Sequence, residues 1–362
     1  MPISSLQDTL SGRRHSRDFA FARGDFLRNR VMIVAAVFLA LLPFWSLIDW
    51  FALPQESIRH VLTARVVMLV VLLLTMLLAH RSKARLQLAR FSAGLLLATP
   101  AVFYAVVMSL LAADSGAAVS LAGYSFIPYM LVAMLAIFPF TLIESTVLGT
   151  GIILLEAWAL YATGVLFTLN GLQAIWLLAA LLAIAVTANY FQLGLMMRLY
   201  REATHDPLTG LLNRGALIHS MEQFALQSPD ASRCLLIMDL DHFKRINDTH
   251  GHAFGDDILR HFSSILRRSL RPVDLACRYG GEEFVAVLAG VDKEGAMAIA
   301  EEIRAQTEAS VLNDYDGQPV HYTVSIGVAS CYPNETFQQA ARRADQRLYE
   351  AKKASRNRVV GV

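Results

Sequence analysis

The sequence is poor in charged residues and in cysteine. Only 17% of its 362 residues are charged, against 55% apolar residues, and the shortage of charge lies in the first two hundred residues. A soluble globular domain carries roughly a quarter of charged residues, so the composition excludes a chain that is soluble throughout. Cys234, Cys277 and Cys331 form no CxxC pair and lie in or beside apolar runs. We therefore exclude a disulfide scaffold and a cysteine metal site, and expect buried, reduced thiols in a cytosolic compartment.

Proline and runs of glycine are absent where the apolar half of the chain gives way to the charged half. Five residues recur there at spacings of three and four: Tyr190, Leu193, Met197, Tyr200 and Thr204. This pattern predicts one continuous helix, whose stripe packs on a partner helix or on its own bundle. Such a helix is a stiff lever, unlike a flexible linker.

The apolar residues fall into six stretches, and most of them reach the roughly 20 residues that a helix needs to cross a bilayer. The stretches cover residues 31–51, 61–79, 91–112, 123–140, 145–166 and 173–197. The fourth is the shortest, and only the turn from Pro139 to Glu144 separates it from the fifth. The pattern predicts a six-helix transmembrane domain over residues 31–197. The polar residues 1–30 in front of it argue against a cleaved signal peptide.

Arginine and lysine gather in alternate flanks of these stretches. They are Arg13, Arg14, Arg17, Arg23, Arg28, Arg30, Arg81, Lys83, Arg85, Arg90, Arg198 and Arg201. The opposite loops contain Asp114 and, apart from Arg59, almost no cations. Because basic loops stay on the cytoplasmic side, we expect both termini in the cytoplasm, with residues 1–30 as a basic cytoplasmic tail.

Two ionisable residues lie within the expected spans. Glu156 is near the middle of the fifth, and Arg65 is about one turn inside the outer end of the second. A charge at such a depth is unfavourable, so each should face the bundle interior and have a partner or a water molecule. Either residue could simply hold helices together, or it could be a ligand or proton site in a sensor. The sequence leaves both readings open.

The charged half alternates between strand and helix patterns. Strands are expected at 234–241 and 321–330, a hairpin at 274–289, and helices from Phe243, at 257–270, at 293–309 and at 337–351. In the strand at 321–330, alternate apolar residues predict burial of one face. Strands alternating with helices around a hairpin predict an α/β sandwich and not an all-parallel sheet.

Paired glutamates lie on a glycine turn inside this hairpin, in the sequence RYGGEEF at 278–284. Two glycines let the backbone approach a ligand closely and adopt positive φ. Glu282 and Glu283 are then held at the rim of the sheet, where Asp239 at the end of a neighbouring strand could join them. Such carboxylates repel one another unless protons or hard cations neutralise them, and oxygen ligands suit Mg²⁺ or Mn²⁺. A nucleoside triphosphate is the natural companion of Mg²⁺ bound in this way.

Four motifs follow one another through the charged half. They are DPLTGLLNR (206–214), MDLDHFKRIND with GHAFGD (238–256), RYGGEEF (278–284) and AKKASRN (351–357). In this order they resemble the diguanylate cyclase family, the GGDEF domains, in its GGEEF variant. The resemblance implies an α+β, nucleotidyl-cyclase-like sandwich over residues 206–362. The continuous helix predicted from the spacing above would join it as a helical linker at 198–205. The apolar half resembles the multi-span sensor modules often joined to such domains, in the bacterial cytoplasmic (inner) membrane.

The resemblance also implies a metal site. Asp239 and Glu283 would bind the metals, two Mg²⁺ or Mn²⁺ ions per active site, with help from the Leu240 carbonyl. Glu282 would be a further metal ligand or the group that accepts the proton of the 3′-hydroxyl.

The substrate contacts implied by the resemblance come from the second motif. Asn247 and Asp256 would hydrogen-bond the guanine edge, where a carboxylate can accept from an N1–H and an amine that adenine does not offer together. Backbone amides near Phe243 and Lys244 would meet the phosphates.

The closing motif would supply positive charge to the triphosphate. Lys352 and Arg356 are four residues apart and are therefore expected on one helix face, with Arg356 as a bidentate fork. Ser355 stands where the family usually has glycine. If that position needs a positive φ, serine strains it by about 1–2 kcal/mol.

A second ligand site is suggested by Arg271 and Asp274. Five residues separate this RxxD pair from Gly280, the spacing at which many relatives bind their own product as an inhibitor. At any other distance from the glycine turn, the same short pattern would indicate only surface charge.

The expected function is a membrane-anchored diguanylate cyclase, which condenses two GTP to cyclic di-GMP and two pyrophosphates as a homodimer in a lipid bilayer. No nucleic-acid polymer is expected as a partner. A catalytically inactive cyclic di-GMP receptor is the first alternative, and a transporter with a regulatory tail is the second, although no paired broken-helix pattern favours it.

Overall fold

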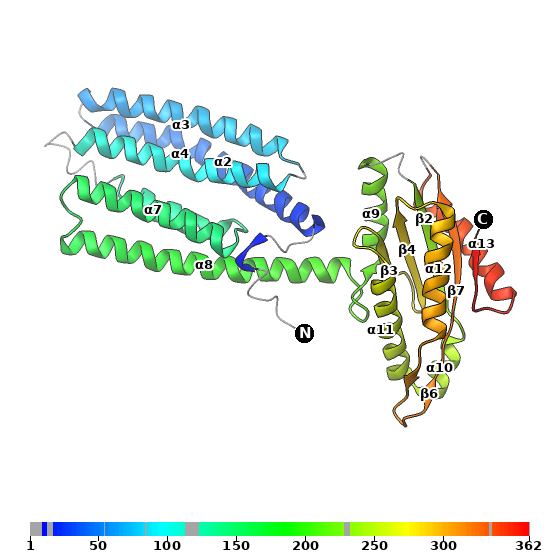
Figure 1. Ribbon diagram of the computed structural model, residues 1–362. Helices are drawn as coiled ribbons and strands as arrows, with labels where there is room; N and C mark the ends of the chain where they lie inside the picture. Colours follow the sequence, from blue (N-terminus) through cyan, green and yellow to red (C-terminus); the bar gives the residue numbers. More distant parts are fainter. Residues whose placement is uncertain are drawn as a thin grey trace. The chain divides into compact units, whose positions relative to one another are not determined.

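The computed structural model describes residues 9–12, 17–53, 55–83, 85–112, 123–227, 232–332 and 335–361. Arg13 and Arg14 of the expected basic tail, and Asp114 of the expected outer loop, lie outside these residues. The chain divides into two compact units, residues 1–199 and 200–362. Figure 1 shows that the first is a helical bundle and the second contains a sheet covered by helices.

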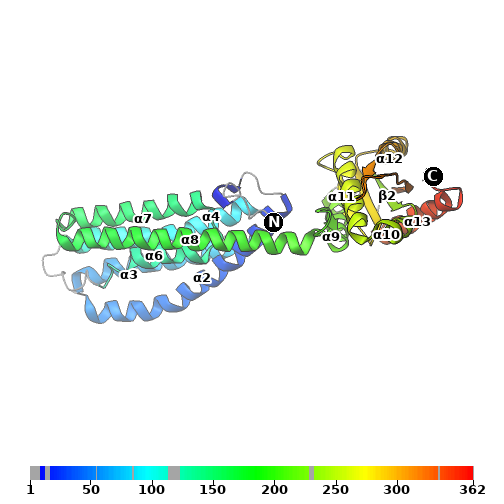
Figure 2. The same ribbon diagram turned by 90° about the horizontal axis from the view of Figure 1, so that it is seen from below.

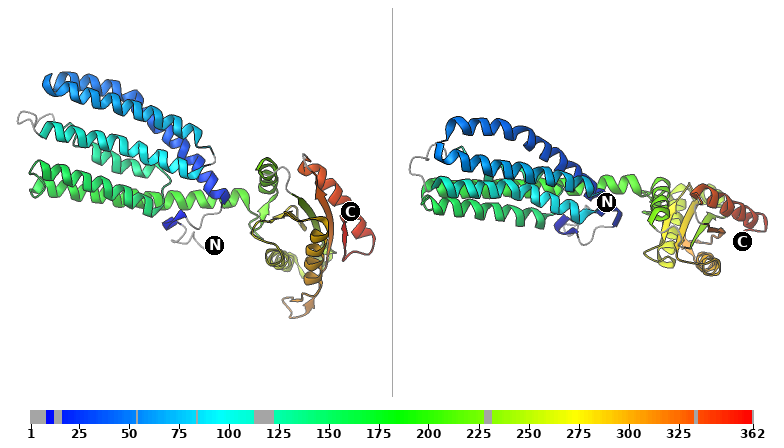
Figure 3. Two further views of the ribbon diagram at one scale, coloured as in Figure 1. Left: turned by 45° about the horizontal axis from the view of Figure 1, so that its top comes forward. Right: turned by 90° about the horizontal axis from the view of Figure 1, so that it is seen from above.

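The first unit is built from helices, most of them long, that run side by side (Figures 1 and 3). They are α2 (Arg17–Ala52), α3 (Gln55–Arg81), α4 (Leu86–Ala112), α6 (Ile127–Met134), the 3₁₀ turn η2 (Leu135–Ile137), α7 (Leu142–Ala162) and α8 (Leu169–Thr204). Leucine, valine and alanine dominate these helices, and many of these side chains face outward, as Val37 and Leu41 do. Apolar residues all round a helix are typical of a helix with an apolar environment.

Within the described residues, five helices have the length and apolar composition to cross a membrane, so the expectation of six full spans is not confirmed. The fourth stretch, expected at 123–140, forms only α6 and η2. At about 1.5 Å per residue their eleven positions rise roughly 16 Å, about half of a hydrocarbon core. The helix ends because the chain tightens into η2 and then becomes extended at Phe138, with φ −94° and ψ 141°. Thr141 then caps the start of α7.

The helix α8 is continuous from Leu169 to Thr204, as the sequence predicted. Leu193 and Met197 from the predicted stripe are buried in the chain itself. This part of the stripe is therefore covered within the chain and is not left exposed for a partner helix.

The second unit contains a six-stranded mixed sheet in the order β1-β3-β4-β2-β7-β8. Its strands are β1 (Leu212–Asn213), β2 (Arg233–Leu240), β3 (Leu275–Arg278), β4 (Glu283–Ala289), β7 (Val324–Cys331) and β8 (Val359–Gly361). The four central strands are antiparallel, whereas β1 and β8 pair in parallel with their neighbours. The short hairpin of β5 (Leu312–Asn313) and β6 (Pro319–Val320) lies outside this sheet.

Helices cover both faces of the sheet (Figure 2). One face packs on α10 (Phe243–His250), α11 (His252–Ser269) and α12 (Lys293–Glu308), and the other on α9 (Arg214–Gln227) and α13 (Phe337–Lys353). The mixed α/β sandwich agrees with the sequence prediction. However, β7 is buried on both faces from Val324 to Ala329, so the expectation that one face is exposed was wrong. The three cysteines are unbonded, and burial raises the pKa of Cys277 to about 12.

Candidate active site

Two carboxylates meet at one end of the central strands. Because β2 and β4 are antiparallel, Asp239 stands directly opposite Glu283 in the register. Side chains in such a pair have Cβ atoms about 4.5–5.5 Å apart. Asp239 is only 6% exposed, Glu282 is half-buried and Glu283 is exposed. The structure thus brings together the strand-end aspartate and the glycine-turn glutamates that the sequence singled out.

The electrostatics of this cluster favour a bound cation. Burial raises the pKa of Asp239, the Lys352 ammonium opposes that rise, and the negative charge of Asp241 adds to it. Burial also raises the pKa of Glu282, and the charges of Asp239 and Glu283 raise it further. Lys352 Nζ lies 2.8 Å from Asp239 Oδ2 and supplies part of the missing positive charge. The carboxylates therefore repel one another, and a cation between them would relieve the repulsion.

The carboxylate oxygens are suitable ligands for a hard divalent ion, but they do not provide a complete coordination shell. Among the described residues, no group of three or more His, Cys, Asp or Glu side chains is placed to hold a metal by itself. Mg²⁺ ordinarily takes one or two carboxylates and completes its shell with waters and substrate phosphates. The facing pair of Asp239 and Glu283 matches that partial shell.

The glycine turn of the β3–β4 hairpin is shaped by close approach and not by positive φ. Neither Gly280 nor Gly281 has a positive φ, so that part of the expectation was wrong. A β-carbon at Gly280 would lie 2.6 Å from Glu283 Oε2, whereas one at Gly281 would meet nothing within 4 Å. Gly280 therefore leaves room for the Glu283 carboxylate, and the space beside Gly281 is open.

Arg278 fixes this turn, and the sequence reasoning assigned it no role. Its Nε and Nη2 donate to the Gly281 carbonyl at 3.1 and 2.8 Å, and its Nη1 reaches both carboxylate oxygens of Asp206 at 3.3 Å. Burial would raise the pKa of Asp206, but hydrogen bonds from Thr209 and the charge of Arg278 hold it below its usual value. The opening motif is thereby tied to the glutamate turn, a link between segments 72 residues apart.

The corner between α10 and α11 positions the expected base readers. Asn247 lies on α10 and Asp256 in the first turns of α11. Asn247 Oδ1 is buried and has no hydrogen-bond partner in the described chain. A β-carbon at Gly255 would lie 1.9 Å from that oxygen, so a larger residue there would displace the Asn247 side chain. An unsatisfied buried amide beside a half-buried carboxylate is suited to a hydrogen-bonding ligand.

The start of α10 contains the expected phosphate contacts. Phe243 is the first residue of the helix and is buried, and Lys244 follows it and is exposed. His242 precedes them in a left-handed conformation, with φ 56°. The first backbone amides of the helix are then the groups that an anion would meet.

The closing motif is not the straight helix face that the sequence suggested. The helix α13 ends at Lys353, and Ser355, Arg356 and Asn357 all have positive φ (83°, 60° and 44°). The Arg356 N–H donates to the Ala351 carbonyl at 3.1 Å, which is the six-to-one bond of a Schellman end. The prediction that Lys352 and Arg356 share one helix face is therefore wrong, because the backbone becomes left-handed before Arg356. The positive charges of Lys352 and Arg356 nevertheless both lower the pKa of Asp239.

Asp241 holds this closing turn against the sheet and was also missed. Its carboxylate is buried and accepts from the Thr323 hydroxyl and the Ser325 hydroxyl at 2.7 Å, and from the Asn357 N–H at 3.0 Å. The only sequence signal was a second aspartate two residues after Asp239. Its neighbours come from segments more than eighty residues away, so spacing alone could not reveal them.

The two residues of the RxxD pair, Arg271 and Asp274, bind each other. Asp274 accepts from the Arg271 guanidinium at 2.8 and 3.0 Å, from the Arg271 backbone N–H at 3.0 Å, and from the Ala289 N–H at 3.0 Å. The Asp274 side chain is 1% exposed, but that of Arg271 is 49% exposed. Burial would raise the pKa of Asp274, and its bonds to Arg271 and Ala289 lower it below the usual value. Asp274 thus fixes the turn before β3, and Arg271 is the member that can reach a ligand.

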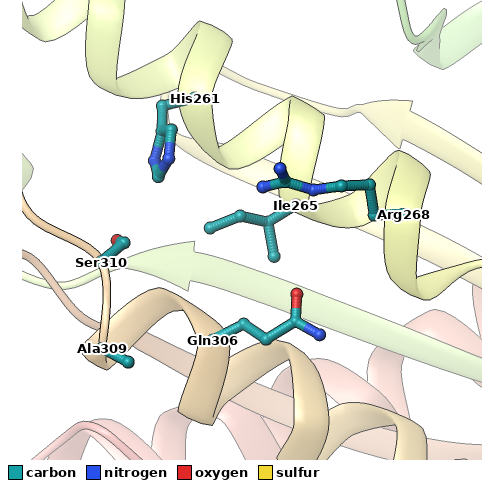
Figure 4. A pocket seen from close by; sticks show the side chains of 6 residues that line it. All are labelled: His261, Ile265, Arg268, Gln306, Ala309 and Ser310. Atoms are coloured by element: carbon teal, nitrogen blue, oxygen red, sulfur yellow. The ribbon is translucent and has the colours of Figure 1, made fainter.

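A separate small hollow of about 270 Å³ lies between α11 and α12 (Figure 4). His261 and Arg268 line it from α11, and Gln306 lines it from α12. His261 Nδ1 lies 2.7 Å from the Tyr322 hydroxyl. None of the expected substrate or metal residues lines this hollow.

The two charges singled out in the first unit are both buried and paired. The Tyr104 hydroxyl donates to Glu156 at 2.5 Å. Arg65 donates to Asp49, which also accepts from the Tyr124 hydroxyl at 2.5 Å, and the guanidinium lies 4.8 Å from the Phe103 ring centroid. As expected, each charge has a partner inside the bundle.

The second unit is similar to known proteins. Among solved structures, the coiled coil and GGDEF domain of DgcB from Caulobacter crescentus, in complex with c-di-GMP, has a TM-score of 0.49 and 32% identity, covering 51% of this chain and 99% of that one. The chain is 42% identical over 161 residues to diguanylate cyclase DgcP of Pseudomonas aeruginosa, covering 44% of this chain and 24% of that protein. It is 42% identical over 164 residues to the response regulator PleD of Caulobacter vibrioides, covering 44% and 36%.

A third relative is the probable diguanylate cyclase DgcT of Escherichia coli, 38% identical over 171 residues and covering 45% of this chain and 37% of that protein. The chain thus spans between about a quarter and two fifths of the length of these curated relatives. The family model described as diguanylate cyclase, GGDEF domain, matches residues 203–358, the region that contains the carboxylate cluster, the glycine turn and the closing motif. Residues 203–358 of this chain therefore form a GGDEF domain.

Proposed function

We propose that the chain is a membrane-anchored diguanylate cyclase, which condenses two GTP to cyclic di-GMP and two pyrophosphates. The observation that carries the proposal is the register of Asp239 against Glu283, with Lys352 on the aspartate, inside a GGDEF domain. An inactive receptor needs no repelling carboxylates at the sheet end, and their presence favours the enzyme. The relatives named diguanylate cyclases support the same reading.

Asp239, Glu283, Glu282 and the Leu240 carbonyl would hold two Mg²⁺ or Mn²⁺ ions. When bound, these ions lower the pKa of a 3′-hydroxyl and offset negative charge on the attacked phosphate. Burial and the charges of its neighbours raise the pKa of Glu282, which would accept the hydroxyl proton as an alternative to binding metal. Lys352 and Arg356 would neutralise the triphosphate, and the first amides of α10 would bind its oxygens.

Guanine selection is assigned to Asn247 and Asp256. The unpartnered Asn247 oxygen can accept a hydrogen bond, and the Asp256 carboxylate can accept from both N1–H and the exocyclic amine of guanine. Adenine has no N1–H, so the same pair of acceptors would leave ATP poorly bound.

The product has two equivalent linkages, and each GGDEF domain has one set of these residues. Two domains must therefore meet in a two-fold arrangement, with each 3′-hydroxyl attacking the other α-phosphate. We assign the five long apolar helices to the bacterial cytoplasmic membrane. Because Glu144 at the start of α7 pairs with Arg23 and Arg90 near the starts of α2 and α4, the segment of α6 and η2 would return the chain to the inner side, so that both termini lie inside. We assign α8 to the control of dimer geometry. The exposed Arg271 guanidinium would bind the product as an inhibitor, with Asp274 holding the turn that presents it.

The direct test is to incubate the purified full-length protein with GTP and Mg²⁺ and to quantify both products. The proposal expects one cyclic di-GMP for every two pyrophosphates, with little product from ATP and none after chelation of the metal. Binding of cyclic di-GMP without any turnover would favour the receptor instead. Solute flux in vesicles without GTP turnover would favour the transporter.

A further inference from the structure

The break between α6 and α7 is held by polar side chains from two other helices. Non-helical backbone that is buried between helices needs partners for its carbonyl groups. Arg23 Nε, from α2, donates to the Pro139 carbonyl at 2.8 Å, and Asn189 Nδ2, from α8, donates to the Leu135 carbonyl at 3.0 Å. Asn189 also contacts Ser145 Oγ at 2.7 Å, next to the first turn of α7. These bonds place a polar cluster inside the bundle.

Positive charge exceeds negative charge in this cluster. The Arg23 side chain is fully buried and pairs with Glu144, and Arg90 Nε, from α4, lies 2.8 Å from the other oxygen of the same carboxylate. Among the described residues, no second carboxylate pairs with either arginine. Two guanidinium groups therefore share one carboxylate, which also accepts from the Thr141 N–H at 2.8 Å. The Arg23 guanidinium is fully buried, so incomplete compensation of its charge is unfavourable unless a further partner is bound, whereas the Arg90 side chain is 35% exposed.

The cluster also has unused hydrogen-bonding atoms. Three of the seven buried, unpartnered side-chain atoms in the described chain belong to it: Arg23 Nη1, Arg90 Nε and Asn189 Oδ1. A fourth, Gln192 Oε1, lies about one helical turn after Asn189 on α8. Arg90 Nε is within ion-pair distance of Glu144, but it makes no hydrogen bond there. Two guanidinium donors require an acceptor, and two amide oxygens require a donor.

We propose that Arg23, Arg90, Asn189 and Gln192 form a binding site for a phosphate group that also bears a hydroxyl donor. The phosphate oxygens would accept from the two guanidinium groups and balance their surplus charge, and the hydroxyl would donate to the amide oxygens. A carboxylate ligand would satisfy only the arginines, because it cannot donate. Inorganic phosphate and the headgroup of a glycerol phospholipid both offer this chemistry.

The experiment uses the full chain in nanodiscs of phosphatidylcholine and measures the thermal unfolding midpoint. One arm titrates inorganic phosphate at constant ionic strength, and the other replaces part of the lipid with phosphatidylglycerol. A ligand that binds only the folded state raises the midpoint as its concentration rises. A rise in the first arm identifies free phosphate, and a rise only in the second identifies the lipid headgroup.

Three variants locate the effect. Arg90→Gln leaves the Arg23–Glu144 pair intact and should raise the half-saturating ligand concentration about tenfold or more, as expected for a lost charged hydrogen bond. Gln192→Met removes an unpartnered acceptor without changing charge and should weaken binding several-fold. Arg81→Gln, at an exposed arginine at the end of α3, should behave like the parent.

No rise in either arm, or equal rises in the parent, Arg90→Gln and Gln192→Met, would overturn the proposal and leave water as the occupant. The inference rests on the proposed membrane location, which is checked separately by resistance of the native chain to alkaline extraction from membranes. GTP turnover is not used as a readout, so failure of the cyclase proposal would not affect this result.

Discussion

Replacing Ser355 with glycine should stabilise the GGDEF domain. Ser355 has φ 83° and occupies the left-handed position after α13, where glycine is preferred. A residue with a β-carbon in this conformation is strained by about 1–2 kcal/mol. Ser355 is exposed and no hydrogen bond is assigned to its side chain, so the substitution removes the strain without removing a contact.

The net gain is smaller than the strain, because glycine also gains freedom in the unfolded chain. This gain in the entropy of the unfolded chain lowers the stability of the variant by about 0.4–1 kcal/mol. The centres of the two ranges differ by roughly 0.8 kcal/mol in favour of the variant, which corresponds to a rise in Tm of about 2–3 °C for a domain of this size. Because Arg356 follows directly, relief of the strain should also lower the KM for GTP or leave it unchanged.

The assay is thermal unfolding of residues 200–362, with Ser355→Gly compared to two matched changes. Ser355→Ala keeps the β-carbon and should give no gain. Ala354→Gly changes the neighbouring residue, whose φ is −87°, and should lower Tm because no strain is relieved there. A Tm for Ser355→Gly that is equal to or below the parent value would refute the reasoning.

Five further outcomes are expected. Asp256→Ser should increase ATP use relative to GTP, since a charged hydrogen bond contributes roughly 1.5–3 kcal/mol; an unchanged ratio of kcat/KM values would exclude Asp256 as a base reader. Arg271→Ala should keep its initial rate within a few-fold of the parent but let product accumulate further, and progress curves with added cyclic di-GMP that show equal inhibition would contradict this. Burial raises the pKa of Asp239, and only its ionised form holds a cation, so turnover should fall on acidification at a pH above its ordinary pKa of about 3.9. Lys352→Met removes a charge that lowers this pKa, so the acid limb of the pH–rate profile should move to higher pH; movement to lower pH would be inconsistent with the pairing. The isolated residues 200–362 should show activity that climbs faster than linearly with concentration and recovers on fusion to a coiled-coil dimer, whereas high activity with strictly linear dependence would argue against control by dimerisation.

Local patterns predicted the elements of the second unit well. The strand that became β2, the β3–β4 hairpin and the helix α13 were visible from apolar spacing and turn residues, since each depends on neighbours in sequence. The same patterns placed Asp239 and Glu283 at strand ends, and the antiparallel register then brought them face to face.

The features that could not be predicted from the sequence depend on distant contacts or on backbone conformation. The burial of both faces of β7 requires knowing that α12 and α13 lie on opposite sides of the sheet. The role of Asp241 depends on Ser325 and Asn357, which are far away along the chain. Apolar composition predicted a span at 123–140, but composition does not show where a helix stops, and the chain breaks after Ile137.

The central claim is that Asp239 and Glu283 together support turnover of GTP to cyclic di-GMP. The most direct measurement compares cyclic di-GMP synthesis by the parent protein with that of Glu283→Gln and Glu294→Gln, which change a carboxylate to an amide at almost constant volume. Glu294 is an exposed residue in the first turn of α12 and serves as the matched control. The account predicts a loss of several orders of magnitude for Glu283→Gln at unchanged Tm, and a parent-like rate for Glu294→Gln. Near-normal synthesis by folded Glu283→Gln would contradict it.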